Sequence, residues 1–180
     1  MATIRPKLTH AGINCFDLDK MKRFYTEVMG LLETDKGKGI TYPVDFVFLS
    51  SDPANHHQLV LASNRSPEAK KSCVNQLSFR VNTMDELRAM WRRVKDHGVE
   101  HMRTVSHGIA WSVYFDDPEG NTVEIYLDTP WYVRQPHGDP LDLEKSNEEI
   151  VRWTEDICRK DPSFVPATDW RAKLAQILAA

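Results

Sequence analysis

The sequence predicts an α+β fold in which two βαβββ modules form a curved mixed sheet around a cavity, followed by a C-terminal helical extension. Two observations carry this prediction. The segment THAGINCFDLDKMKRFY, which begins at Thr9, aligns with NQLSFRVNTMDELRAMW, which begins 66 positions later at Asn75. Farther along, FLSSDPANHHQLVLA and YFDDPEGNTVEIYLD each place an Asp-Pro turn between two extended runs. The repeated unit is therefore one strand, one helix and about three strands.

The helix of each module has recognisable ends. Asp17 and Thr83 occupy N-cap positions, after which apolar residues recur at helical spacing. Gly30 and Gly98 then stand where the two helices should stop. We expect modules at about residues 8–64 and 74–128, which together make a paired domain over residues 1–130.

Residues 131–180 differ from the repeat in amino-acid composition. The segment TPWYVRQPHGDP is rich in Pro and aromatic residues, which is typical of a wrapping segment with little regular structure. Ser146 and Glu149 have the spacing of a capping box before IVRWTEDIC, so a helix should begin there. A last helix is expected from about Asp169 to Leu178.

The amino-acid composition and the net charge argue against several classes of function. The chain has 180 residues, a net charge of -3 and 41% hydrophobic residues, which is typical of a globular protein. No apolar run is long enough for a membrane span, and the start MATIRPKLTHAG lacks the apolar core of a signal peptide, so we expect a cytoplasmic protein without a membrane partner. The three cysteines have no CxxC spacing, and the balanced charge argues against a nucleic-acid partner. A small-molecule site is the better hypothesis.

The repeat indicates which polar residues are equivalent. His10 corresponds to Gln76, and Glu124 corresponds to Leu59. Alternation along a strand puts His10 on the same face as Gly12 and leaves apolar residues to pack under the helix. A His, an amide and a carboxylate on facing strands could form a three-ligand metal site with open positions.

The paired units, with THAGIN, NHHQLVLA and HGIAWSVYFDDPEGNTVEIY, resemble the vicinal oxygen chelate superfamily over about two thirds of the chain. That superfamily includes glyoxalase I, fosfomycin-resistance enzymes, bleomycin-binding proteins and type I extradiol dioxygenases, and the resemblance is strongest to the dioxygenases. It implies a homodimeric enzyme of aromatic degradation that binds a small catechol-type substrate and dioxygen.

The resemblance also implies roles for individual residues. His10, Gln76 and Glu124 would be the metal ligands, with Gln76 at the position where the dioxygenases have a second His. The metal would be Fe(II), or Mn(II) or another divalent ion, since an amide oxygen is a weaker donor to iron than imidazole. His57 would be the acid-base residue, and His107 and Tyr114 would bind the substrate. Candidate aromatic walls of the cavity are Phe46, Trp111, Trp131 and Tyr132.

Each assignment has a structural alternative. Tyr114 could simply pack in the sheet, and His107 could be an ordinary loop residue. Since strand neighbours point to opposite faces, only one of His56 and His57 should face the cavity, and the resemblance favours His57. Two other functions stay open. A glyoxalase-like lyase or isomerase usually needs a fourth ligand where Leu59 stands, and a metal-free, bleomycin-type binding protein generally lacks a His and Glu set.

Overall fold

The computed structural model describes residues 4–41, 43–70 and 72–179, so residues 1–3, 42 and 71 of the predicted domain, and residue 180 of the extension, lie outside it. The chain divides into two compact units. The first contains the residues up to Cys73 together with Asp117–Asn121, and the second contains Val74–Asp116 and Thr122 onward.

The first unit contains the first module. Its elements are β1 (Ala11–Asn14), α1 (Leu18–Arg23), the π-helical segment η1 (Phe24–Val28), β2 (Leu32–Lys38), β3 (Asp45–Ser50) and β4 (Leu59–Ala62). The strands form one sheet in the order β1-β4-β3-β2, in which β1 and β4 are parallel and the other pairs are antiparallel. Helix α1 packs on β3 and β4.

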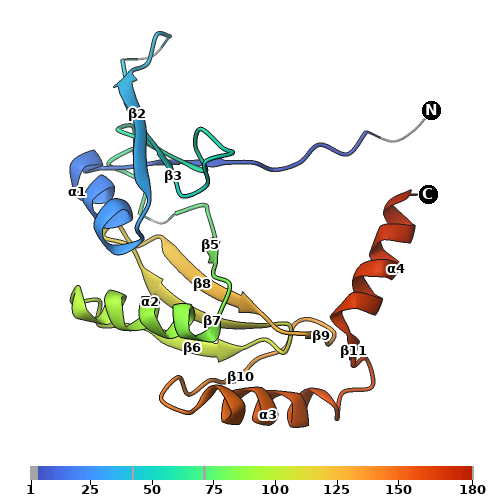
Figure 1. The fold of residues 1–180 in the computed structure, drawn as a ribbon. Helices are drawn as coiled ribbons and strands as arrows, with labels where there is room; N and C mark the ends of the chain where they lie inside the picture. Colours follow the sequence, from blue (N-terminus) through green and yellow to red (C-terminus); the bar gives the residue numbers. More distant parts are fainter. Residues whose placement is uncertain (1–3, 42, 71, 180) are drawn as a thin grey trace. The chain divides into compact units, whose positions relative to one another are not determined.

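The second unit repeats this arrangement. Its module consists of β5 (Leu77–Arg80), α2 (Met84–Asp96), β6 (Arg103–Ser106), β7 (Ala110–Asp116) and β8 (Thr122–Asp128). The sheet order is β10-β6-β7-β8-β5, so apart from the added β10 (Asp139–Pro140) it matches the first module strand for strand. Figure 1 shows α2 lying along this sheet. The predicted α+β class is thus confirmed, with each βαβββ module forming its own mixed sheet.

Side-chain hydrogen bonds cap the N-termini of α1 and α2 at the predicted positions. The side chain of Asp17 accepts a hydrogen bond from the Lys20 backbone N–H, and that of Thr83 accepts one from Glu86. These bonds satisfy N–H groups that have no partner within the helix. Beneath the helices, alternate residues of the last strands are buried, namely Leu59 and Leu61 of β4, and Val123 and Ile125 of β8.

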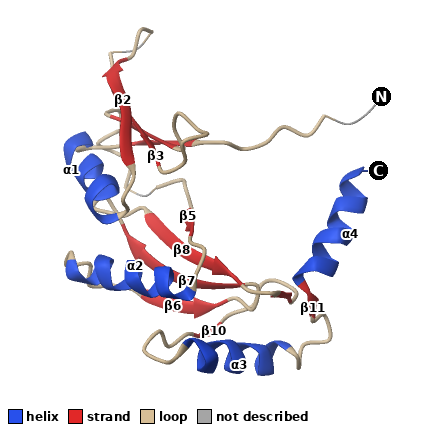
Figure 2. Cartoon of the chain, in the orientation of Figure 1, coloured by secondary structure: helices blue, strands red, loops and turns tan. Residues whose placement is uncertain are grey.

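The C-terminal segment adds β9 (Trp131–Tyr132), α3 (Asn147–Cys158), β11 (Val165–Pro166) and α4 (Ala167–Ala179) to the second unit (Figure 2). Helix α3 begins with the predicted capping box of Ser146 and Glu149. Trp111 donates a hydrogen bond to Thr154 of α3 and is buried, so it belongs to the core under α3 and does not line the pocket described below. In the described part of the chain, no helix has the length and apolarity needed to cross a membrane.

The strand register corrects one predicted equivalence. Gly12 and Phe48 both pair with Val60, whereas Ser78 and Tyr114 both pair with Glu124. Val60, and not Leu59, is therefore the counterpart of Glu124. The sequence alignment missed this because Phe48 and its partner Val60 are two positions farther apart than Tyr114 and its partner Glu124, which shifts β4 relative to the repeat.

Candidate active site

The second unit contains a pocket of about 740 Å³. Alternation along β8 points Glu124 and Tyr126 to one face, while Val123 and Ile125 are buried on the other. Polar lining residues come from β5, β7, β8 and their connections, and aromatic lining residues come from the C-terminal segment. The polar ones include Gln76, Ser78, His107, Tyr114 and Glu124, and the aromatic ones include Trp131, Tyr132 and Trp170.

Glu124 is the centre of the polar part. It is only 7% exposed, and both carboxylate oxygens accept hydrogen bonds. Oε2 accepts from Gln76 Nε2 at 2.9 Å and from Ser78 Oγ at 2.5 Å, and Oε1 accepts from Tyr114 Oη at 2.6 Å. These donors are neutral, and among the described residues Glu124 has no ion-pair partner. A buried carboxylate without a countercharge is costly, which is the environment that a bound cation would relieve.

Gln76 and Ser78 form one side of this network. The Gln76 amide nitrogen donates to Ser78 at 3.0 Å as well as to Glu124. This orientation directs the amide N–H groups at Ser78 and the carboxylate, and it leaves the amide oxygen, the atom that can coordinate a metal, without a hydrogen bond among the described residues. Ser78 was not predicted, although its position two residues after Gln76 places it on the same strand face.

His107 and Tyr114 form the other side. His107 Nε2 lies 2.9 Å from Tyr114 Oη, and its Nδ1 lies 2.7 Å from the carbonyl oxygen of His137, to which Nδ1–H donates. Burial, followed by the hydrogen bond and charge of Glu124, raises the pKa of Tyr114 to about 12. The phenol therefore stays protonated at neutral pH, and its hydroxyl oxygen lies between the imidazole and the carboxylate.

His10 and His57 lie in the first unit. Their ring centroids are 4.4 Å apart, and His57 also contacts Phe48 at 5.2 Å. Desolvation, and then repulsion from His10 and His56, lowers the pKa of His57. The ring of His56 contacts Phe48 too, and its Nδ1 lies 2.9 Å from that of His57. The predicted opposite facing of the two is thus wrong, because both precede the start of β4 at Leu59 and loop residues do not alternate.

The predicted site residues thus fall into two groups. Gln76, Glu124, Tyr114 and His107 meet in the pocket of the second unit, and His10 meets His57 in the first. Within the described ranges there is no group of three or more His, Cys, Asp or Glu side chains arranged to hold a metal. The predicted ligand set includes an amide and so contains only two residues of those types.

The lining of the pocket departs in part from the sequence predictions. Trp131 and Tyr132 line it as expected, while Phe46 belongs to β3 of the first unit, where it stacks on Phe48. Trp170 and Arg171 of α4 also line the pocket and were not predicted. No sequence signal places the last helix beside β8, because that contact depends on how the wrapping segment folds.

Comparisons with known proteins identify the family. Residues 7–125 match the model of the Glyoxalase/Bleomycin resistance protein/Dioxygenase superfamily. The chain belongs to this superfamily. Its members typically bind divalent metals.

Three individual proteins illustrate the relationship. Biphenyl-2,3-diol 1,2-dioxygenase 3 of Rhodococcus globerulus is 28% identical over 131 residues, which are 70% of this chain and 65% of that enzyme. This chain thus spans about two thirds of the relative's length. A glyoxylase/bleomycin resistance protein/dioxygenase domain from Frankia sp. EAN1pec has a TM-score of 0.58 at 23% identity, over 70% of this chain and all of that one.

The third is a variant of the fosfomycin resistance protein FosX from Listeria monocytogenes, solved with Mn(II) and 1S,2S-dihydroxypropylphosphonic acid. It has a TM-score of 0.55 at 20% identity, over 70% of this chain and 95% of that one. At such identities the two structural matches establish the shared fold. Residues 126–180 lie beyond the family match.

Proposed function

We propose that the protein is a metal-dependent dioxygenase of the extradiol type, which uses dioxygen to cleave the ring of a catechol-like aromatic. The main supporting observation is the buried Glu124 carboxylate, which has only neutral hydrogen-bond donors within the described residues and shares a pocket with His107 and Tyr114. The similarity to a biphenyl-diol dioxygenase supports the choice of reaction. We further propose that the enzyme is a cytoplasmic homodimer.

His10, Gln76 and Glu124 would hold the metal, which we propose is Fe(II). The donor set suits a divalent ion, because Glu124 supplies a buried negative charge and Gln76 has an unengaged amide oxygen. A divalent metal, when bound, would attract both hydroxyl oxygens of the substrate and lower their pKa. Since Gln76 replaces an imidazole, Mn(II) or another divalent ion is the alternative.

The other site residues would bind the substrate and move protons. Tyr114 and His107 would hydrogen-bond the substrate oxygens, since the phenol lies beside the carboxylate and the imidazole is fixed through Nδ1. His57 would take a proton from the substrate and return it. Trp131 and Tyr132 would line the cavity around the substrate and exclude water.

The decisive experiment combines metal content with oxygen uptake. Protein purified without oxygen should contain about one iron per chain and should consume oxygen with catechol or biphenyl-2,3-diol. Gln76→His should strengthen Fe(II) binding and raise ring cleavage, because it completes a face of two His and one carboxylate. Asn75→His, one position earlier on the chain, should change neither.

Other outcomes would favour the alternatives. Wild-type protein that isomerises a hemithioacetal, with a Gln76→His variant that binds iron but consumes no oxygen with any catechol, would indicate a glyoxalase-like lyase or isomerase. The register argues against that function, since Val60 takes the place of the fourth ligand and cannot coordinate. Protein that binds aromatics tightly without metal would instead be a sequestration protein of the bleomycin-binding kind.

A further inference from the structure

The aromatic part of the pocket belongs to the C-terminal extension. Trp131, Tyr132, Trp170 and Arg171 line it, and all four lie beyond the region that matches the family. The rings of Tyr132 and Trp170 stack with centroids 5.0 Å apart and planes inclined by 12°. Figure 1 shows α4, which carries Trp170 and Arg171, following β11 next to β9. The extension thus supplies a wall made of two stacked aromatic rings.

A positive charge lies beside this wall. Asp128 Oδ2 is 3.6 Å from Arg171 Nη2 and 3.5 Å from Arg80 Nη1. Both distances exceed the 2.7–2.9 Å of a charge-assisted hydrogen bond. Among the described residues, one carboxylate is therefore shared by two guanidinium groups, which leaves one positive charge without a countercharge. The Arg171 side chain, 61% exposed, keeps N–H donors available for another acceptor.

The charged part of the pocket is well separated from Glu124. Asp128 follows Glu124 by four residues on β8, so the two point to the same face at a separation of about 13 Å along the strand. The pocket of about 740 Å³ falls within the range for ligands larger than a single ring. A ligand that reaches both parts must therefore extend well beyond a catechol ring.

We propose that the C-terminal extension selects an aromatic substrate that carries a carboxylate at the end remote from the reacting ring. The flat part of the ligand packs on Tyr132 and Trp170, and Arg171 binds the carboxylate through its planar fork of donors. The identification of the reacting end rests on the proposed dioxygenase function. Recognition of the anionic end rests on the extension alone.

The test compares two ligands of matched shape, biphenyl-4-carboxylate and biphenyl-4-carboxamide, by isothermal titration calorimetry with the full chain. The carboxylate should bind about fivefold more tightly, which is the size expected for a partly exposed ion pair. Arg171→Gln should remove this preference by weakening only the carboxylate. Trp170→Leu should weaken both ligands equally, and Lys173→Gln, on the same helix but outside the pocket lining, should weaken neither.

Equal affinity for the two ligands in the wild type, a preference that survives Arg171→Gln, or no binding of either ligand would overturn the proposal. Its failure is distinct from failure of the dioxygenase function. Oxygen uptake with neutral catechols by the wild-type protein, together with no carboxylate preference, would keep the function and reject the anionic subsite. A carboxylate preference in a protein without oxygen uptake would keep the subsite and reject the function.

Discussion

The two modules share a strand order and pairing pattern but differ in the face that each sheet leaves free of its helix. The positions matched by register are Gly12, Phe48 and Val60 in the first module, and Ser78, Tyr114 and Glu124 in the second. The first set has no polar side chain. The second is joined by hydrogen bonds around the Glu124 carboxylate.

This difference between the two faces distinguishes residues that the fold requires from residues that a functional site requires. In both modules the last strand buries alternate apolar residues, Leu59 and Leu61 in one, Val123 and Ile125 in the other. Burial of that face is enough to fix the module, so the residues between are free to diverge. A buried carboxylate with its own set of donors in only one module therefore indicates a function and not a need of the fold.

The hairpins before the last strands differ as well. The Asp117–Asn121 turn is tight, because Asp117 accepts hydrogen bonds from the backbone of Glu119 and Asn121 and from the Tyr25 hydroxyl. The longer connection in the first module places His56 and His57 in a loop, next to Phe48. The extra residues of this connection thus bring two imidazole rings to a face of the sheet whose strands contain no histidine.

Among the tests of this comparison, we expect the largest effect from replacement of Glu124. Glu124→Ala should abolish binding of divalent metal, because it removes the anionic ligand and leaves a dication among neutral groups. Val60→Ala changes the register-matched position of the first module and should leave the metal content unaltered. Elemental analysis after loading with Fe(II) and desalting measures both. An unchanged metal-to-protein ratio in Glu124→Ala would remove the site from consideration.

The second test concerns the first module. If His57 carries the proton, His57→Ala should lower turnover by about 100- to 10,000-fold, with metal content and substrate affinity nearly unchanged. His101→Ala, an exposed histidine of the second unit, should have no effect. Since His56 and His57 both contact Phe48, His56→Ala must be measured beside them. Turnover lost only in His56→Ala would transfer the role to that residue, and turnover kept in both would deny it to this module.

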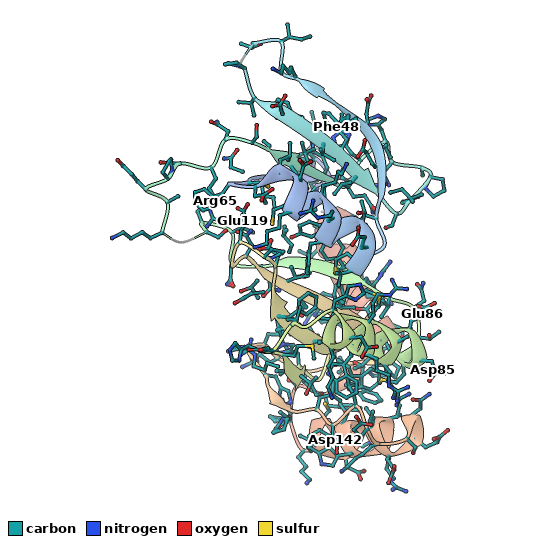
Figure 3. The ribbon with its side chains drawn as sticks, turned by 90° about the vertical axis from the view of Figure 1, so that its left-hand side faces the viewer. Phe48, Arg65, Asp85, Glu86, Glu119 and Asp142 are labelled. Carbon is teal, nitrogen blue, oxygen red and sulfur yellow. The ribbon has the colours of Figure 1, made fainter. Side chains whose placement is uncertain are left out.

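A third test breaks the tight turn. Glu119 pairs with Arg65 at 3.2 Å, and its carboxylate also accepts from the backbone N–H groups of Phe16 and Asp17. Figure 3 labels Arg65 and Glu119 next to each other. Their side chains are 8% and 5% exposed, so Glu119→Ala should lower the free energy of unfolding by about 3–5 kcal/mol, because the buried Arg65 would lose its countercharge and keep only the backbone carbonyl of residue 119 and the Phe16 ring.

Asp52→Ala in the longer connection of the first module is the matched control. Asp52 accepts only local hydrogen bonds, from Ala54 and Asn55, so its loss should cost about 1 kcal/mol. Urea denaturation compares the two variants. Equal stability losses would mean that the Arg65–Glu119 pair contributes no more than an ordinary turn contact.

The sequence was sufficient to predict the features that depend on neighbouring residues. Helix starts at Asp17, Thr83 and Ser146 follow from side chains that cap the next turn, and the βαβββ order follows from the repeat. The grouping of Glu124 with Gln76 and Tyr114 was also predictable, because strand alternation and one tight turn bring them to a common face.

Features that depend on loop length or distant packing could not be predicted. Phe48 and Val60 are two positions farther apart than Tyr114 and Glu124, so Val60 and not Leu59 is the counterpart of Glu124, and no local signal reports this difference. Strand β4 begins only at Leu59, so His57 lies in the connection before it and not in the strand. Trp170 reaches the pocket only because the extension pairs β11 with β9 and thereby positions α4.

The test with the smallest expected effect compares the two sheets at one position matched by strand register. Tyr114→Phe removes the hydroxyl that donates to Glu124 Oε1, so a buried carboxylate oxygen loses a hydrogen bond and the free energy of unfolding should fall by about 1.5–3 kcal/mol. Phe48→Tyr makes the reverse change at the equivalent, half-buried position, where the matched Val60 offers no acceptor, and should alter stability by less than about 0.5 kcal/mol. Thermal and urea unfolding of both variants without added metal measure the difference. Equal effects would mean that the Tyr114–Glu124 hydrogen bond contributes nothing to the second module and that the contrast between the two faces is one of composition alone.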